Sequence, residues 1–116
     1  MIKSGMIYNR GDIVLVPFIY SDLSSFKFRP ALILSNNLVR FSDDKICCLV
    51  TSKSWPGDVL INKNDLISGS LPIKSFVRPE VLLTVNSKMI KRKICSIKPL
   101  LIENIVSKIN DYLSRT

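Results

Sequence analysis

Short apolar runs alternate with polar turn segments over the first three-quarters of the chain. Runs of this length, rich in Val, Ile and Leu and bounded by Gly, Pro, Asn and Ser, are typical of β-strands. The predicted strands are Asp12–Val16, Pro30–Leu34, Ile46–Val50, Asp58–Ile61 and Val81–Val85, with short edge candidates at Met89–Ile90 and Ile94–Ile97. The runs 30–34 and 46–50 are continuously apolar, which indicates strands buried on both faces.

Two polar segments between these strands are predicted to be loops. Ser21–Lys27 is rich in serine and long enough to be mobile. Asn62–Pro72 carries several turn residues, and Asp65–Ile67 within it is predicted to form at most one helical turn.

The hydrophobic period changes near the C-terminus. From Pro99 to Leu113 the apolar residues recur at spacings of three and four, which predicts one face of an amphipathic helix. Pro99 suits the first helical position, whereas Lys98 at the N-cap has no acceptor side chain, so packing must hold this helix. Many short strands and one terminal helix predict a single domain over residues 1–116, a small, strongly curved β-barrel closed on one side by the helix.

Composition narrows the class of protein. Of the 116 residues, 47% are hydrophobic and 22% charged, as in a globular domain, and no apolar run approaches the roughly 20 residues that span a bilayer. Met1–Gly5 lacks the apolar stretch of a signal peptide, so we expect a cytoplasmic protein with no membrane association. The three cysteines (Cys47, Cys48 and Cys95) stand in apolar contexts and are expected to be reduced and buried.

The charge is strongly basic, with 17 Lys and Arg against 9 Asp and Glu, a net charge of +8. Such a balance favours a polyanionic partner, nucleic acid or an acidic protein, although a solvated basic surface without a partner is the alternative. The chain has no histidine, which excludes the commonest general base and zinc ligand. The adjacent Asp43 and Asp44 are not accompanied by further ligands, so no metal or other cofactor is expected.

Arg29 opens the apolar run 30–34, and Thr51 and Ser52 close the run 46–50. A guanidinium can form two hydrogen bonds to a phosphate and stabilise additional charge on it, and a neighbouring hydroxyl can donate to the same phosphate. The alternatives are structural: Arg29 paired with Asp12 or Glu80, and hydroxyls bonded to nearby backbone.

Four segments in order along the chain carry a resemblance to a known family: Gly11-Asp12-Ile13-Val14, Arg29-Pro30-Ala31, Thr51-Ser52 and Ser75–Glu80. Together they resemble the MazF/PemK (Kid) family of bacterial toxin endoribonucleases. The resemblance implies an SH3-like barrel of the CcdB/PemK/MazF type, a homodimer, and a cognate antitoxin that blocks the site and joins the toxin in DNA binding. It also implies metal-independent, sequence-selective cleavage of single-stranded mRNA to 2′,3′-cyclic phosphate and 5′-OH ends.

In that family the arginine of the Arg-Pro step and the hydroxyl residue ending the following strand are the catalytic pair. The resemblance therefore implies catalytic roles for Arg29 and Thr51, with Ser52 as an adjacent candidate. The predicted RNA contacts are Lys27, Phe28, Lys53, Trp55 and Arg78. Phe28 is alternatively a core residue, Trp55 a dimer-interface aromatic and Arg78 a structural arginine.

Two other functions remain as alternatives. A CcdB-like toxin shares the barrel but poisons DNA gyrase through a C-terminal tryptophan, and this chain ends Asp111–Thr116 without one. A non-catalytic RNA-binding barrel would use Arg29 and Thr51 only to position phosphate, and it would bind RNA without cutting it.

Overall fold

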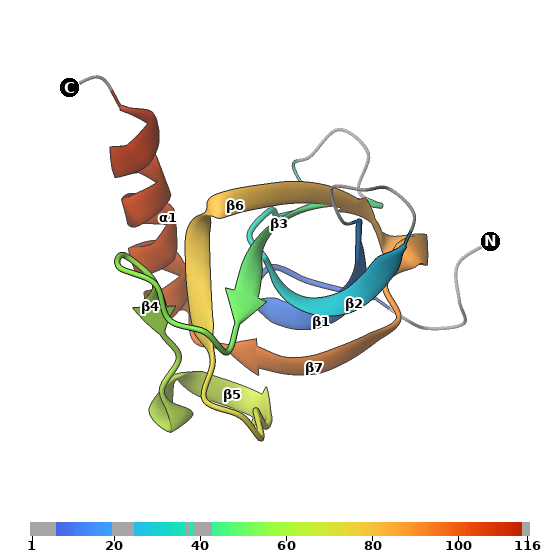
Figure 1. The fold of residues 1–116 in the computed structure, drawn as a ribbon, viewed down its shortest axis with the longest axis horizontal. Coiled ribbons are helices and arrows are strands. Elements are labelled where there is room, and N and C mark those ends of the chain that lie inside the picture. Colours follow the sequence, from blue (N-terminus) through green and yellow to red (C-terminus); the bar gives the residue numbers. More distant parts are fainter. Residues whose placement is uncertain (1–6, 20–24, 37, 39–42, 115–116) are drawn as a thin grey trace.

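The computed structural model describes residues 7–19, 25–36, 38 and 43–114. Within these residues, seven antiparallel strands form one curled, barrel-like sheet, and one α-helix lies against one side of it (Figure 1). The strands are β1 (Asp12–Ile19), β2 (Phe26–Ile33), β3 (Asp44–Thr51), β4 (Val59–Leu60), β5 (Leu66–Gly69), β6 (Phe76–Asn86) and β7 (Arg92–Ile97). Their order in the sheet is β4-β6-β3-β2-β1-β7-β5. The predicted mainly-β fold with a C-terminal helix is confirmed.

The apolar runs 30–34 and 46–50 lie almost entirely in β2 and β3 and are largely buried on both faces, as predicted, whereas the first four residues of β2 are exposed. Alternate residues enter two different hydrophobic clusters: Leu32 and Cys48 join the cluster that includes the helix, whereas Ala31 and Cys47 join the other. Within these two runs the prediction is wrong at Ile46, which is 40% exposed. All three cysteines are free and buried, and burial raises the pKa of the Cys47 and Cys48 thiols to about 12.

The helix α1 (Pro99–Leu113) has the predicted bounds. Its buried residues Leu101, Ile102, Ile105 and Ile109 complete the first cluster, so one helical face closes the core (Figure 1). Pro99 occupies the first turn and the Lys98 N-cap makes no side-chain capping bond, so packing of this face holds the helix. No helix in the described part of the chain is long and apolar enough to cross a membrane.

Strand β6 is longer than the predicted Val81–Val85, and it turns a corner (Figure 1). The corner lies at a register shift: Cys48 of β3 pairs with Leu82, whereas the next residue, Leu49, pairs with Arg78. Pro79 falls inside the skipped segment, where its missing N–H breaks no ladder bond. Pro79 therefore marks a bend within the strand.

The segment Asn62–Pro72 contains a strand that the loop prediction missed. The helical turn is a 3₁₀ turn at Lys63–Asp65, and β5 follows directly and pairs with β7. Gly69 has φ of +75°, and a Cβ there would lie 2.4 Å from the carbonyl oxygen of Ile94, so only glycine allows this close approach.

Three smaller predictions change as well. Val59–Leu60 is shorter than predicted because only two residues pair with β6. Met89 belongs to a 3₁₀ turn (Ser87–Met89) and is not an edge strand. The predicted loop Ser21–Lys27 lies mostly outside the described residues, and its last two residues begin β2.

Candidate active site

Arg29 and Thr51 come from neighbouring strands. The β2–β3 pairing runs from Ile33 opposite Cys47 to Ala31 opposite Leu49. The pairing ends there, and Arg29 and Thr51 each lie two residues beyond this last pair, on neighbouring strands. Because side chains two residues apart on a strand point to the same face, Arg29 and Thr51 are on the sheet face that Ala31 and Leu49 share. That the two residues share one phosphate stays a prediction.

Thr51 is half-buried at the end of β3, and its hydroxyl shapes the turn that follows. Its Oγ1 accepts a hydrogen bond from the backbone N–H of Lys53 at 3.2 Å. A hydroxyl that accepts one bond keeps its own proton for donation, so this contact is compatible with a second bond to a phosphoryl oxygen. Ser52 and Lys53 follow Thr51 directly, and both are exposed.

The loop after Thr51 is fixed by a buried ion pair. Arg78 of β6 donates from Nε to Oδ1 of Asp58 at 3.1 Å and from Nη2 to Oδ2 at 2.9 Å. The same Nη2 donates to the backbone carbonyl of Lys53 at 2.8 Å. The side chains of Arg78 and Asp58 are 7% and 0% exposed. We call this set of contacts the Arg78 lock, because it joins β6 to both ends of the loop.

The electrostatics of the lock are favourable to both charges. Hydrogen bonds from Arg78 hold the pKa of the Asp58 carboxyl below its usual range, against the opposing effect of burial. The same bonds raise the pKa of the Arg78 guanidinium further. Of the two roles weighed for Arg78, a structural contact is present in the fold, and contact with RNA stays a prediction.

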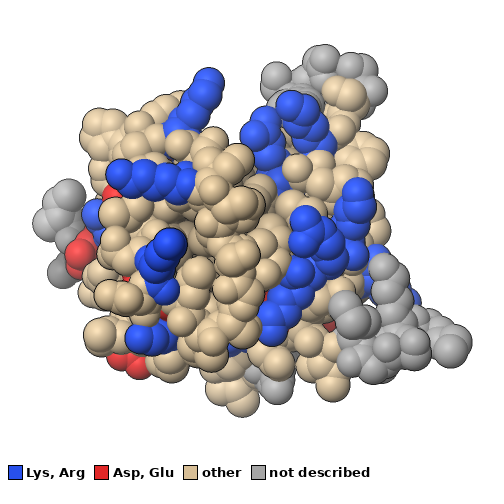
Figure 2. Space-filling model, turned by 90° about the horizontal axis from the view of Figure 1, so that it is seen from below, with Lys and Arg blue, Asp and Glu red and all other residues tan. Residues whose placement is uncertain are grey.

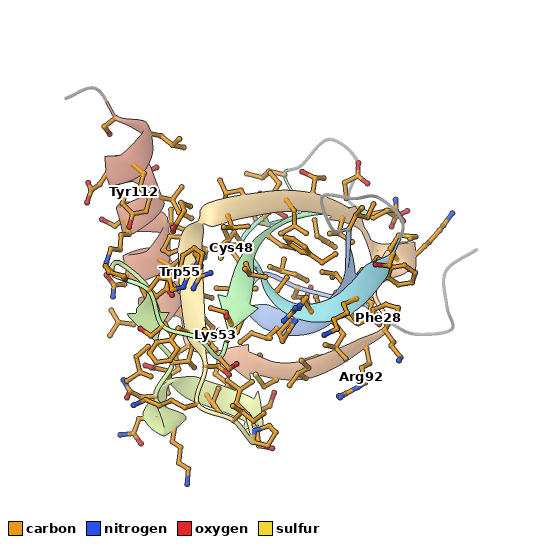
Figure 3. All side chains as sticks on the ribbon, viewed as in Figure 1. Phe28, Cys48, Lys53, Trp55, Arg92 and Tyr112 are labelled. Carbon is orange, nitrogen blue, oxygen red and sulfur yellow. The ribbon has the colours of Figure 1, made fainter. Side chains whose placement is uncertain are left out.

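Trp55 stacks on the lock. The guanidinium carbon of Arg78 lies 3.7 Å from the centre of the Trp55 ring, a short cation–π distance. The backbone N–H of Trp55 also donates to Oδ2 of Asp58 at 2.8 Å. Even so, Trp55 remains 58% exposed. Figure 3 shows Lys53 and Trp55 beside the end of β3.

Phe28 lies on β2 next to Arg29, on the other side of the barrel from Trp55 in Figure 3. It is 39% exposed and therefore not a core residue. Its ring meets Phe26 edge to face, with centroids 5.5 Å apart, and the ammonium of Lys91 lies 4.8 Å from its centroid. Lys27 is also exposed and pairs across the strands with Phe18. These placements leave both residues available to a ligand without testing their predicted RNA contacts.

On the face of the molecule seen from below Figure 1, basic side chains form several groups separated by uncharged surface, and few acidic side chains are visible (Figure 2). The run Lys91-Arg92-Lys93 is exposed at the start of β7, and Lys93 pairs with Asp12 at 3.3 Å. Within the residues that the structure describes, no group of three His, Cys, Asp or Glu side chains is placed to hold a metal ion.

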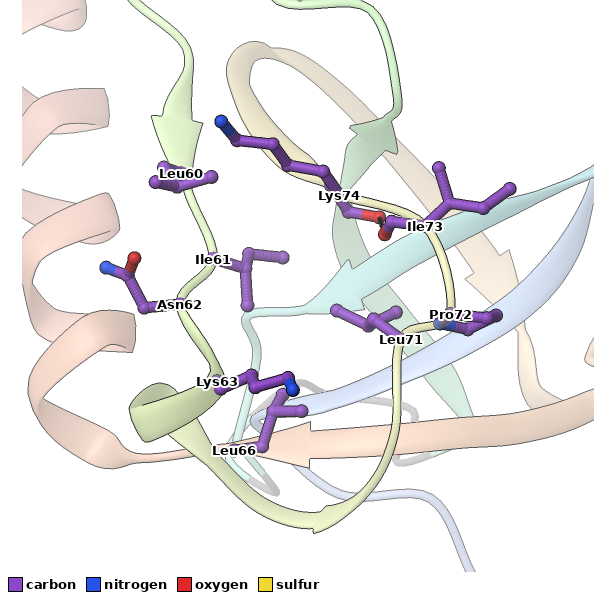
Figure 4. Close-up of a pocket in the computed structure, with 10 residues that line it drawn as sticks. Leu60, Ile61, Asn62, Lys63, Leu66, Leu71, Pro72, Ile73 and Lys74 are labelled. Carbon is purple, nitrogen blue, oxygen red and sulfur yellow. Dashed lines mark hydrogen bonds between the residues drawn. The ribbon is translucent and has the colours of Figure 1, made fainter.

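An open pocket of about 430 Å³ lies between β4 and the segment before β6 (Figure 4). Apolar side chains such as Leu60 and Leu71 line it, with Lys63 and Lys74 among the polar ones. None of the predicted site residues lines this pocket. The candidate active site is a surface arrangement of Arg29, within β2, and Thr51, at the end of β3, and it is separate from the pocket.

One residue that matters to this arrangement, Asp58, was missed from the sequence. Asp58 opens the predicted strand Asp58–Ile61, and its partner Arg78 is 20 residues further on. No spacing pattern connects the two residues. The only local signal is an acidic residue directly after the tight turn at Pro56-Gly57.

The comparisons with known proteins agree with this fold. The family described as PemK-like, MazF-like toxin of type II toxin–antitoxin system matches residues 9–113. Among curated proteins, none matches the sequence.

Several solved structures are similar in fold. MazE–MazF (Form-II) from Deinococcus radiodurans has a TM-score of 0.73 and 18% identity over 96% of this chain and 99% of that one. An endoribonuclease in complex with its cognate antitoxin from Mycobacterial species has a TM-score of 0.68 and 20% identity over 91% and 92%. The Mycobacterium tuberculosis toxin MazF-mt6 has a TM-score of 0.67 and 18% identity over 88% and 95%.

Proposed function

This chain belongs to the family of PemK-like, MazF-like toxins of type II toxin–antitoxin systems, and from that premise we propose that it is an endoribonuclease. Its substrate is single-stranded mRNA, cut selectively by sequence without a metal ion. Two similar structures are themselves described as an endoribonuclease and a MazF toxin. The observation that carries the proposal is that Arg29 and Thr51 lie on neighbouring strands, each two residues beyond the last β2–β3 pair, Ala31 and Leu49.

The chemistry follows from the side chains available. The 2′-OH of the RNA attacks the adjacent phosphorus, the bond from phosphorus to the 5′ oxygen breaks, and the products are a 2′,3′-cyclic phosphate and a 5′-OH. Arg29 stays protonated at neutral pH, so it stabilises the charge that develops on the phosphoryl oxygens and is not a conventional base. Thr51 donates a hydrogen bond from its hydroxyl to one of those oxygens and keeps its proton, and Ser52 is the adjacent alternative donor. The proton of the 2′-OH leaves through water or substrate, and by the same route the departing 5′ oxygen gains the proton that makes it a 5′-OH.

The proposed partners are RNA, a cognate antitoxin and a second copy of the chain. Similar structures contain MazE with MazF, or a toxin with its cognate antitoxin. A net charge of +8 attracts both RNA and an acidic, partly disordered antitoxin segment, so we expect the two to compete for one surface. A cytoplasmic location accords with these partners.

The alternatives have less support. The single tryptophan, Trp55, lies in the loop after β3 and not at the C-terminus, where a CcdB-like gyrase poison would need it. A non-catalytic RNA-binding barrel would keep the same geometry and differ only in leaving RNA intact.

One experiment separates these possibilities. Purified protein is incubated with a long RNA in EDTA, and the ends of the products are mapped. We expect discrete cuts with cyclic phosphate and 5′-OH ends, with the rate lowered on the order of 100-fold or more in Arg29→Ala. Replacing the ribose at one cut by deoxyribose should abolish that cut alone. Intact RNA, cleavage that needs added metal, or full activity of Arg29→Ala would overturn the proposal.

A further inference from the structure

The Arg78 lock and the ring that it carries suggest a binding subsite. We infer that Trp55 is a stacking platform for one unpaired nucleobase of the RNA, close to the phosphate bound by Arg29 and Thr51. This inference rests on the proposed function, since it names a subsite of the same RNA.

The first argument is that the two faces of the Trp55 ring have different surroundings. One face of Trp55 is covered by the guanidinium of Arg78 at 3.7 Å, yet the residue is 58% exposed. The exposed area must therefore lie on the opposite face and the edges. A nucleobase stacked there would complete a sandwich of base, indole and guanidinium, with apolar surface buried on both sides of the indole.

The second argument is that the loop does not need the ring. Asp58 and the carbonyl of Lys53 already hold Arg78, and these bonds define the loop without any contribution from the indole. A large apolar side chain that contributes little burial to its own fold is suited to burial against a ligand. Because the guanidinium is fixed, the ring is also preorganised, which lowers the entropy lost when a base stacks on it.

The third argument is position. Trp55 follows Thr51 by four residues, so their Cα atoms are at most about 14 Å apart. The exposed Lys53 lies between them in the sequence and is available to a backbone phosphate of the same strand. An extended RNA bound at Arg29 and Thr51 can therefore reach the ring with a neighbouring nucleotide.

The single tryptophan makes the test direct, because intrinsic fluorescence above the tyrosine range reports on this ring alone. The probe is a short mixed-sequence single-stranded RNA, with deoxyribose at the cut position wherever cleavage is observed. We expect the RNA to quench the Trp55 emission, and the quenching to saturate together with binding measured by anisotropy. Saturable binding without any change in emission would overturn the inference.

Variants then separate stacking from a structural role. Trp55→Ala should weaken binding of the intact RNA by between about 5-fold and about 150-fold, and Trp55→Phe should recover part of the loss. An RNA with one abasic position should lose the same affinity against the native protein, and should lose little more against Trp55→Ala. The control is Ile67→Ala on β5, which is 62% exposed and should bind like the native protein. Full additivity of the abasic and Trp55→Ala losses would contradict direct stacking.

The outcomes also separate this inference from the proposed function. Quenching and abasic sensitivity without cleavage would support the platform and overturn the nuclease. Cleavage that depends on Arg29, with no quenching of Trp55 emission, would support the nuclease and overturn the platform. Emission that shifts on dilution in the absence of RNA would place Trp55 in a dimer interface and overturn the platform.

Discussion

Two exposed aromatic rings in this protein, Trp55 and Phe28, each have a basic side chain over one face. They differ in what holds that basic side chain in place. Arg78, over Trp55, is buried and makes three hydrogen bonds to Asp58 and the carbonyl of Lys53. Lys91, over Phe28, is itself exposed and lies 4.8 Å from its ring. A guanidinium can be fixed by a carboxylate in one orientation, whereas an ammonium on a flexible stem cannot.

The difference has consequences for recognition. The ring of Trp55 is held in one position before any ligand arrives, so less entropy is lost when a base stacks on it. Phe28 and Phe26 meet edge to face on an exposed part of β2 and have no comparable support. We therefore expect Trp55 to make the stronger contact with RNA and Phe28 an adaptable, weaker one.

The largest expected effect comes from removing the buried cation. Arg78→Met leaves the Asp58 carboxylate buried without its partner and should lower the free energy of unfolding by about 3–5 kcal/mol, measured in urea. The matched variant Lys91→Met should change it by less than about 0.5 kcal/mol. In the double variant Arg78→Met/Asp58→Leu we expect much of the loss to be recovered, because no buried charge is left unpaired. Equal effects of the two single variants would contradict the comparison.

A smaller difference is expected in RNA affinity. Trp55→Ala should weaken binding more than Phe28→Ala does, because the second ring must be ordered as the RNA binds. Binding isotherms with the same single-stranded RNA at one fixed salt concentration provide the measurement. A greater loss of RNA affinity in Phe28→Ala than in Trp55→Ala would contradict the view that Trp55 is the preorganised ring.

The lock should also respond to acid. The pKa of Asp58 is lower in the folded protein than in the unfolded chain, where an aspartate titrates near about 3.9. Its contribution to stability is therefore complete above that value and is lost as the pH falls below it toward the folded pKa. We expect Asp58→Asn to be less stable than the native protein at neutral pH, with the gap narrowing below about pH 4. A gap independent of pH would show that the carboxylate charge does not stabilise the fold.

The smallest effect should be seen in the salt dependence of binding. Lys91→Met should reduce the slope of log affinity against log salt by roughly one if Lys91 meets a phosphate, with stability unchanged. Should the slope stay the same, Lys91 only covers Phe28.

The fold could be predicted wherever the pattern along the chain was local and strong. The apolar faces of β1 to β3 and the three-and-four spacing of α1 determine those elements with little help from the rest of the molecule. β5 was missed because its residues, Leu66–Gly69, resemble a loop, and it becomes a strand only by pairing with β7. β6 was predicted too short because only Val81–Val85 is a predominantly apolar run, and the residues before it join the strand through a register shift that depends on β3.

The candidate site likewise contains residues that a local pattern identifies and contacts that depend on distant segments. Arg29 and Thr51 could be selected because each stands at the end of a recognisable apolar run. Arg78 was singled out as well, but its partner was not, since an ion pair between residues 58 and 78 leaves no periodic signal. Contacts between distant segments form only when strand order and register are known.

The Arg78 lock also constrains the order in which the protein can assemble. The loop after Thr51 receives its shape from a residue 20 to 25 positions further along the chain. Closing so long a segment costs entropy that only the docking of β6 repays. A nascent or truncated chain that stops before Arg78 already contains both proposed catalytic residues. In such a chain, the loop that carries Trp55 would lack the hydrogen bonds from Arg78 that fix it. The proposed stacking site at Trp55 therefore forms only after the strands that hold Arg29 and Thr51 have been synthesised.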